Sequence, residues 1–496
     1  MKQALAETAL RGMEPRERPF LSHFNSDCES GSADRLCRQR LYALKHGNAD
    51  WQTAVQILGS SQAARAAELR MVAFVSFGDL CTFAEGRGST RLRLLSMAPP
   101  HCLVGDDVRM NEISAPANTI LQKKSAQIAA AALAPNAERV DREAEWPVDG
   151  LHALADAGLL GLHIPKHLGG LGEGLLSLAI VTEELGRACS STAMCFGMHC
   201  VASKVLAAKA TKDQENRYLR PIAEGRHITT LALSEPGTGA HFFLPRSHYW
   251  VQGDDFVLDG QKSFVTSGSH ADSYVVSAVP PGAELDPGTF TCLVMDSERP
   301  GIEWLEAWRG LGMRGNSSRG AKLNHVTTPR ANLLGVAGDQ IWYVFEIVAP
   351  YFLIAMAGVY LGIAQAALDL TIARLQSRRH EHTGETLSTI SALSDEIADM
   401  WTRTERARQL VHHAARLGDA GAPDAQAALF AAKLDVAEAA VASTNAAMML
   451  GGGRGYQENS AVGRLLRDAQ AAHVMSPTTH LLKRWLGRSV LGMPLL

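Results

Sequence analysis

Glycines and residues with a hydroxyl group are concentrated in two stretches that lie far apart along the chain. The first stretch, Leu231-Ala-Leu-Ser-Glu-Pro-Gly-Thr-Gly-Ala, places Gly237 and Gly239 close to Ser234. The second runs from Gly451 to Thr479 and begins with three consecutive glycines. Because glycine has no side chain, it lets the backbone come close to a bound group. Both stretches therefore suit contact with a pyrophosphate.

The second stretch also holds residues that could transfer a proton. His473 lies three residues before Ser476, about one helical turn, so both side chains can face one cleft. Imidazole titrates in the range that a catalytic base needs, although a lone histidine is more often a surface or core residue. A serine hydroxyl without a partner base cannot remove a proton. His473 is therefore the candidate base, with His241 as the second choice.

Four motifs, in this order, resemble those of the acyl-CoA dehydrogenase family of flavoproteins. Residues 231–240 resemble its V-T-E-P-x-A-G-S-D fingerprint, and Gly260-Gln-Lys-Ser-Phe-Val-Thr-Ser-Gly resembles its G-x-K-x-W-I-T-N segment. Leu311-Gly-Met-Arg-Gly-Asn-Ser-Ser, followed by Pro329-Arg-Ala-Asn-Leu-Leu, resembles G-x-R-x-S ahead of P-x-x-N-x-L. The stretch from Gly451 resembles the C-terminal signature. Each motif is weak alone, but together they cover about residues 113–496 and are specific.

The resemblance implies FAD as cofactor, with FMN as the alternative, and assigns residues to it. Leu233 and Ser234 would hold the pyrimidine edge of the flavin ring, and Thr266 would lie near its N5 atom. Phe264 replaces a tryptophan that shields the ring. Without the other motifs, Phe264 and Thr266 would be strand residues on one face of an alternating run. The other cofactor positions are Gly239, Ala240 and Thr478, together with Gly452, Gly453 and Gly455 from the facing subunit. The substrate positions are Arg314 and His241.

The catalytic positions of the family are changed in this sequence. A family member oxidises an acyl thioester by removing the α-proton with a carboxylate while hydride leaves the β-carbon. Counted from Arg467-Asp468, the position of that carboxylate holds Ser476, and the alternative position on the long central helix holds Phe352. Neither residue is a base. Arg467-Asp468 is itself a family feature, or else an exposed charge pair on a helix.

Three functions remain open. The first is an oxidoreductase that acts on the CH–CH group of an acyl thioester of CoA or a carrier protein, with a base other than the usual glutamate. The second is a flavin-dependent monooxygenase on the same fold, which needs no base for an α-proton. The third is a non-catalytic acyl-binding homologue. The resemblance also implies a homodimer or homotetramer, and an electron-transfer flavoprotein or flavin reductase as partner.

The hydrophobic period predicts a mostly α fold with a central β domain, as in acyl-CoA dehydrogenases: an N-terminal helical domain, a β-barrel-like middle domain and a C-terminal four-helix bundle. The predicted divisions are an extension over 1–112, helices over 113–227, strands over 228–337 and helices over 338–496. Asp259-Gly260 predicts a two-residue hairpin turn. The predicted strands include 273–279 and 289–295. The predicted helices are 117–134, two helices over 176–208, 340–378, 387–418, 424–450 and 460–488.

The composition excludes several classes of protein. A net charge of −3 over 496 residues favours neither nucleic acid nor an anionic membrane as partner. Eight cysteines without a C-x-x-C pair predict reduced thiols in the cytoplasm and no metal site. Val348–Leu368 is apolar enough for a membrane span, but its pattern favours a buried bundle helix. The extension over 1–112 lacks a sustained period and predicts a poorly ordered segment or an over-long start.

Overall fold

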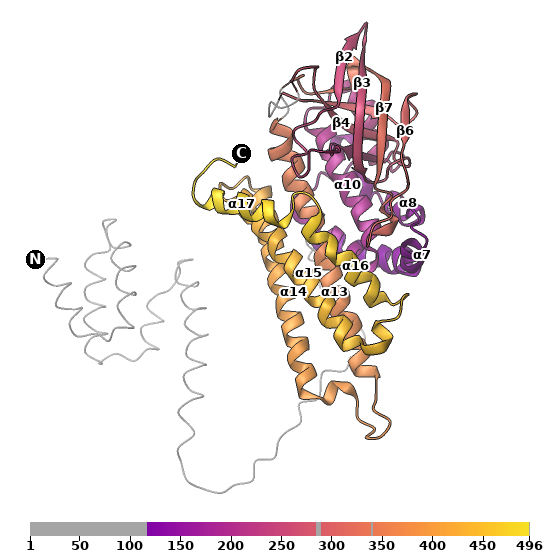
Figure 1. Ribbon diagram of the computed structural model, residues 1–496, viewed down its shortest axis with the longest axis vertical. Helices are drawn as coiled ribbons and strands as arrows, with labels where there is room; N and C mark the ends of the chain where they lie inside the picture. The colour runs from indigo at the N-terminus through magenta and orange to yellow at the C-terminus, as the bar shows by residue number, and fades with distance from the viewer. Residues whose placement is uncertain (1–116, 284–288, 339–340, 496) are drawn as a thin grey trace, which may run out of the picture. The chain divides into compact units, whose positions relative to one another are not determined.

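The computed structural model describes residues 117–495, apart from 284–288 and 339–340 (Figure 1). The predicted extension over 1–112 lies outside the described residues. The described chain forms helices, then β strands, then helices again. This order confirms the predicted fold class.

The N-terminal part of the described chain is helical. Its helices are α6 (Ala117–Ile128), α7 (Ala137–Arg142), α8 (Val148–Asp156), α9 (Leu175–Ala188), α10 (Ser190–Ala208), α11 (Lys212–Gln214) and α12 (Arg220–Ala223). The π-helical turn η1 (Ala129–Leu133) continues α6. Nearly every residue of α10 is buried, as expected for a helix that is apolar on all sides.

The middle part consists of two four-stranded sheets, ordered β1-β4-β5-β8 and β2-β3-β7-β6. The strands are β1 (Thr229–Ala232), β2 (His248–Gln252), β3 (Asp255–Val265), β4 (Ser273–Ala278), β5 (Thr291–Asp296), β6 (Ile302–Trp304), β7 (Arg319–Pro329) and β8 (Leu333–Leu334). Strands β1 and β4 pair in parallel, and the other pairs are antiparallel. Residues Leu258, Val276 and Leu323 belong to the apolar core of this part.

The predicted hairpin turn at Asp259-Gly260 is wrong. Both residues lie inside β3, and the turn between β2 and β3 falls at Gly253, which has a positive φ of 62°. Gly260 is required for a different reason: a Cβ there would lie 2.6 Å from the Cβ of Ser247. The register of β3 against β7 also shifts at this point. Gly260 therefore permits a bulge and a close approach of the segment that precedes β2.

Replacing Gly260 with alanine is expected to lower the free energy of unfolding by about 1–3 kcal/mol, because the new methyl group would overlap Ser247. Its φ of 152° adds strain for any residue with a side chain. Urea denaturation of the two proteins measures the difference. Gly487→Ala is the matched control, since a Cβ on that helical glycine meets nothing within 4 Å. Equal losses in the two variants would contradict the prediction.

The C-terminal part is a helical bundle. Its helices are α13 (Ala349–Ser377), preceded by the π-helical turn η8 (Tyr343–Val348), then α14 (Ser391–Asp419), α15 (Ala425–Gly455), α16 (Ala461–Val474) and α17 (Thr479–Val490). The single helix predicted over 460–488 is therefore two helices. Pro477 follows the end of α16, and proline has no amide to continue the helical hydrogen bonds. Thr478 then begins α17 by accepting a hydrogen bond from the Leu481 amide.

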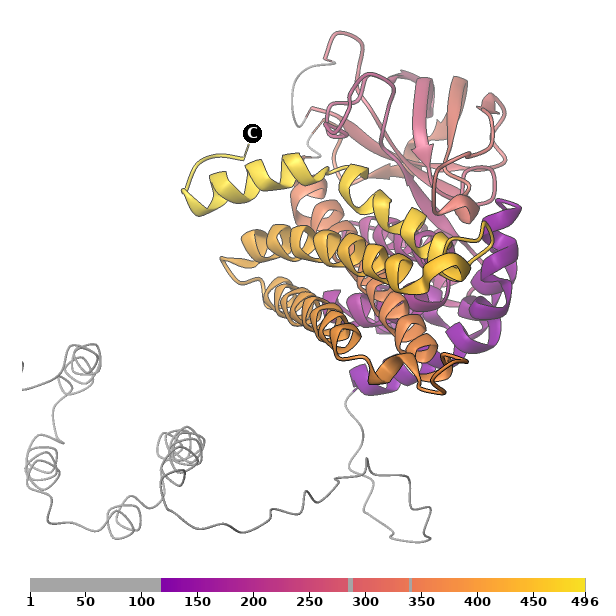
Figure 2. The same cartoon turned by 60° about the horizontal axis from the view of Figure 1, so that its bottom comes forward.

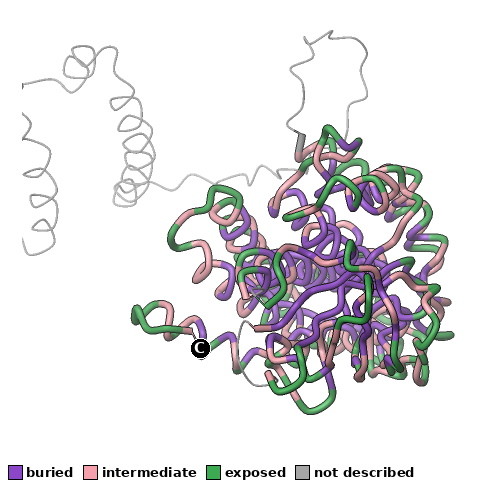
Figure 3. Tube along the Cα trace, turned by 90° about the horizontal axis from the view of Figure 1, so that it is seen from above, coloured by how far each residue is buried: buried purple, intermediate pink, exposed green. Residues whose placement is uncertain are grey.

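The long apolar helix lies inside the protein. Among the described residues, Tyr343–Ser377 is long and apolar enough to cross a membrane, and 89% of its apolar window is buried by the rest of the chain. Figure 3 shows that the buried residues, drawn in purple, gather in the interior of the described part of the chain. Gly358 and Gly362 let α13 touch α9, since a Cβ on either would lie within 2.3 Å of a helix α9 atom. The predicted buried bundle helix is confirmed.

Candidate active site

A buried ion pair holds the glycine-rich loop that follows β1. Lys262 Nζ, on β3, lies 2.5 Å from Glu235 Oε1, and both side chains are almost fully buried. Glu235 also accepts the backbone amides of Arg246, at 2.7 Å, and Ser247. Burial would raise the pKa of Glu235, but Lys262 and these donors together hold it below its usual value. The pair therefore closes residues 235–247 into a fixed loop, which we call the fingerprint loop.

Both residues of this pair stand within the motifs, but the sequence alone predicted no role for either. The signal was available, because Glu235 stands beside the two loop glycines and Lys262 stands in the G-x-K segment. An acidic residue of a loop and a basic residue of a strand form a buried pair only where the fold brings the two segments together. That pairing is a tertiary contact, and the local pattern does not contain it.

The predicted flavin-ring residues meet where β1 and β3 end. The Ser263 amide donates to the Ser234 carbonyl at 2.8 Å, which joins the two segments. Thr266 is 2% exposed, and its hydroxyl lies 3.1 Å from the hydroxyl of Ser318. Phe264 is 67% exposed. The interpretation of Phe264 and Thr266 as strand residues on one face is wrong, because the register shifts between Lys262 and Val265.

The conformation of these residues fits the ring end of a flavin. Phe264 has a φ of 54°, which is rare for a bulky residue, and its ring lies nearly perpendicular to the Trp308 ring, with 6.2 Å between the ring centres. An exposed aromatic ring in a strained backbone suits a planar ligand that covers it. Gly237 and Gly239 also have positive φ, and a Cβ on either would meet nothing within 4 Å. The backbone of the fingerprint loop is thus open to a bound group.

The predicted glycines at the other end of the cofactor belong to the bundle. Gly452 has a φ of 53° and interrupts the last turn of α15. A guanidinium nitrogen of Arg374 lies 3.7 Å from the place of a Cβ on Gly452, and Arg374 Nε donates to the Leu450 carbonyl at 3.2 Å. This cation beside a glycine turn fits an anionic group. Gly453 is exposed and Gly455 is buried.

The structure brings the position of the missing base onto the fingerprint loop. Ser476 Oγ donates to the Ala240 carbonyl at 3.2 Å. His473 faces another residue: its Nδ1 lies 2.9 Å from Thr479 Oγ1. His473 and Ser476 do not share one helical turn, contrary to the prediction, because α16 ends at Val474. His241, the second candidate base, is exposed on the loop.

Arg467 and Asp468 are not an exposed charge pair. The Asp468 carboxylate is 2% exposed and accepts the Met313 amide at 2.5 Å, as well as the hydroxyl of Ser190. Arg467 donates to Asp141 at 2.9 Å and to the Leu311 carbonyl at 3.0 Å. These two residues of α16 therefore fasten the bundle to the β part and to the N-terminal helices.

Two further predicted residues have structural partners. Arg314, predicted to contact substrate, lies with its Nε 4.0 Å from Asp141. The Thr478 hydroxyl, predicted to contact the cofactor, caps α17. In Figure 2 the yellow helices α16 and α17 run between the β strands and the orange bundle helices. Their junction, together with the fingerprint loop, forms the candidate active site.

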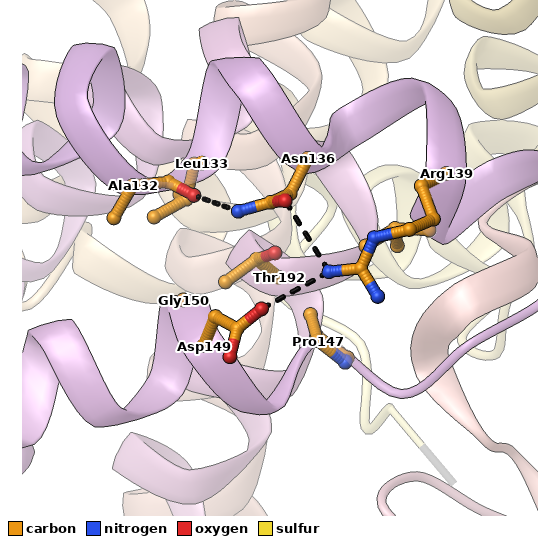
Figure 4. Close-up of a pocket in the computed structure, with 9 residues that line it drawn as sticks. Ala132, Leu133, Asn136, Arg139, Pro147, Asp149, Gly150 and Thr192 are labelled. Carbon is orange, nitrogen blue, oxygen red and sulfur yellow. Dashed lines mark hydrogen bonds and ion pairs between the residues drawn. The ribbon is translucent and has the colours of Figure 1, made fainter.

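A small cavity lies in the N-terminal helices, away from these residues (Figure 4). Its volume of about 10 Å³ holds about one water molecule. Asn136 and Arg139 line the cavity and are joined by a hydrogen bond, and Arg139 forms an ion pair with Asp149 at 3.0 Å. It is too small for a flavin or an acyl chain. Within the described residues, no cluster of His, Cys, Asp or Glu could hold a metal ion.

Comparison with known proteins identifies the family. Three models of acyl-CoA dehydrogenase domains match: the N-terminal domain over residues 116–226, the middle domain over 230–326 and the C-terminal domain over 353–491. Probable acyl-CoA dehydrogenase YngJ of Bacillus subtilis is 31% identical over 367 residues, which cover 72% of this chain and 94% of that protein. Acryloyl-CoA reductase (NADH) of Anaerotignum propionicum is 29% identical over 374 residues, covering 75% and 94%.

The fold also resembles that of a solved acyl-CoA dehydrogenase structure. The structure of butyryl-CoA dehydrogenase from Megasphaera elsdenii matches with a TM-score of 0.72 at 24% identity, covering 78% of this chain and all of the other. With the three domain matches and the identity to YngJ, this likeness agrees with the four motifs. The chain belongs to the acyl-CoA dehydrogenase family of flavoprotein oxidoreductases.

Proposed function

We propose that the protein is an FAD-dependent oxidoreductase that acts on the CH–CH group of an acyl thioester and uses a base other than glutamate. The observation that carries this proposal is the hydrogen bond from Ser476 to the Ala240 carbonyl. It seats the junction of α16 and α17 on the fingerprint loop, beside the residues that fit the flavin ring. In this proposal the acyl thioester binds beside this contact, with its α-carbon toward the junction and its β-carbon toward the cofactor.

Bound flavin supplies the acceptor for the hydride that leaves the β-carbon. Leu233, Ser234 and Thr266 would hold the flavin ring, and Phe264 would cover it. The α C–H bond breaks at the same time, its proton goes to a base of the chain, and a carbon–carbon double bond forms. Ser476 cannot be that base, because its hydroxyl donates to the Ala240 carbonyl and has no partner base among the described residues.

His473 is the base in this proposal. The proposal uses the tautomer of His473 that carries its proton on Nδ1, because the two ring nitrogens of a neutral imidazole have opposite roles. When Nδ1–H donates to Thr479 Oγ1, Nε2 keeps its lone pair and can accept the α-proton. The same contact then holds the imidazolium in place. Thr479 is buried at the start of α17, so the orientation of the ring is fixed by the fold.

Flavin absorbance under anaerobic conditions tests this function. Butyryl-CoA or palmitoyl-CoA is expected to bleach the bound flavin, and His473→Gln is expected to slow the bleaching by about 10²–10⁴-fold. His480→Gln is the matched control, because His480 is an exposed histidine of α17. Ser476→Glu is expected to speed the bleaching by restoring a carboxylate. If His473→Gln reacts as fast as His480→Gln, His473 is not the base.

One observation favours a second function, that of a flavin-dependent monooxygenase. The position of the family's carboxylate holds a hydroxyl that is tied to the backbone, and a monooxygenase needs no α-proton base. Oxygen uptake with supplied reduced flavin, together with no bleaching by either thioester, would replace the first proposal by this one. A flavin reductase would then be the partner, whereas an electron-transfer flavoprotein would serve the dehydrogenase. A colourless protein that cannot be reconstituted would leave only acyl binding.

A further inference from the structure

Lys433, in α15, is a buried amine with no acidic partner. The residue is 1% exposed, and no carboxylate of the described chain forms an ion pair with it. Its Nζ donates to the Ala472 carbonyl at 2.8 Å and lies 4.8 Å from the centre of the Tyr360 ring. Burial lowers the pKa of the amine to about 7. Such a group costs stability, because an amine loses its hydration without gaining a carboxylate.

The partner of Lys433 is the end of α16. The last hydrogen bond of that helix joins the Met475 amide to the Ala471 carbonyl at 3.0 Å. The carbonyls that follow have no amide of the helix to accept, and Lys433 supplies a donor to the next one, Ala472. In its protonated form the amine also interacts favourably with the helix dipole. Lys433 therefore caps α16 from inside the bundle.

Tyr360, on α13, lies beside the Lys433 amine and also contacts a residue that follows α16. Its hydroxyl lies 3.8 Å from the sulfur of Met475, directly before Ser476. Burial raises the pKa of Tyr360 far above its usual value, and nearby Asp468 raises it further, so the phenol keeps its proton and remains a donor. Lys433 and Tyr360 thus hold Ala472 and Met475, the two residues that flank His473 and Val474.

We propose that Lys433 is a positioning residue of the candidate active site. It holds the junction Ala472–Pro477 against the fingerprint loop from the side of the helical bundle. This inference rests on the proposed function only in its catalytic consequence. The amine contacts the bundle side of the junction, and Ser476 contacts Ala240 on the other side. Loss of the inner contact would free His473 and Ser476 to move together, while the bundle around them stays packed.

Lys433→Met tests the inference in the full-length protein. Methionine keeps the length and the apolar stem but removes the donor, so the melting temperature is expected to stay the same or to rise. Hydrogen exchange of the amides from His473 to Leu481 is expected to become about tenfold faster, because their anchor is lost. At saturating thioester, kcat is expected to fall by about 10–100-fold, as for a misplaced catalytic group, with KM changed by less than about threefold.

Two comparisons make the test specific. Lys483→Met removes an exposed lysine of α17 and is expected to change neither exchange nor kcat. Tyr360→Phe keeps the ring beneath the amine but removes the contact with Met475, and it is expected to speed the same exchange by a smaller factor. This variant replaces Lys433→Met should the latter fail to fold.

Exchange and turnover separate the two proposals. Faster exchange at the junction in a protein that oxidises no thioester would sustain the positioning role and overturn the proposed dehydrogenase. Unchanged exchange and unchanged kcat in Lys433→Met, in a protein that does oxidise thioesters, would overturn the positioning role alone.

Discussion

Lys262→Met is expected to lower the free energy of unfolding by about 3–5 kcal/mol, the range measured for breaking a buried ion pair from one side. Methionine fills the space of the lysine stem but leaves Glu235 as a buried carboxylate without a cation. The lysine also donates to the Ser277 carbonyl at 2.5 Å, and that acceptor loses its partner too. The fingerprint loop, which this pair closes, should open before the rest of the β part unfolds.

Urea denaturation measures the loss, and flavin content after purification reports on the loop. Lys322→Met is the matched control, because Lys322 lies on the neighbouring strand β7 and its pair with Glu303 is half exposed. Such a surface pair contributes no more than about 1 kcal/mol. The double variant Lys262→Met/Glu235→Gln should lose less than Lys262→Met alone, since no charge is then left unpaired. Equal losses from Lys262→Met and Lys322→Met would show that the buried pair is not what fixes the loop.

The hydrophobic period predicted the order of helices and strands, and long-range contacts explain where the local patterns were wrong. Asp259-Gly260 is a favourable turn sequence, yet β3 continues through it because β7 pairs along nearly its whole length. The actual requirement for Gly260 is the nearness of Ser247. A residue thirteen positions away in the sequence is outside any turn pattern.

In the candidate site, too, the sequence predicted some residues, and others are recognised only from long-range contacts. The motifs brought Ser234, Thr266 and Ala240 to attention, and the structure does join the segments that carry them. Lys433 gave no signal, because a lysine in an alanine-rich helix is ordinarily a solvated residue. Only the packing of α15 against α13 and α16 shows that this lysine is inside.

Asp468→Ala is expected to lower the free energy of unfolding by about 2–6 kcal/mol, because it leaves two buried donors without an acceptor, each at about 1–3 kcal/mol. These donors are the Met313 amide and the Ser190 hydroxyl. Asp399→Ala is the matched control, since Asp399 is an exposed residue of α14 paired with Arg403 one turn away. A loss as small as that of the control would mean that Asp468 does not fasten α16 to the β part.

The pH dependence of the same site has a definite sign. Burial raises the pKa of Asp468, although the Met313 amide and Ser190 oppose the shift. A carboxyl whose pKa is higher in the folded state binds more protons there, so stability falls as pH rises from the ordinary aspartate range through the raised value. Asp468→Asn removes that titration. The advantage of the wild type over Asp468→Asn should therefore be largest in acid and shrink with rising pH, because the ionised carboxylate is the form that the buried junction disfavours. An advantage that instead grows with pH would show that the two donors outweigh burial and that Asp468 is held there as the anion.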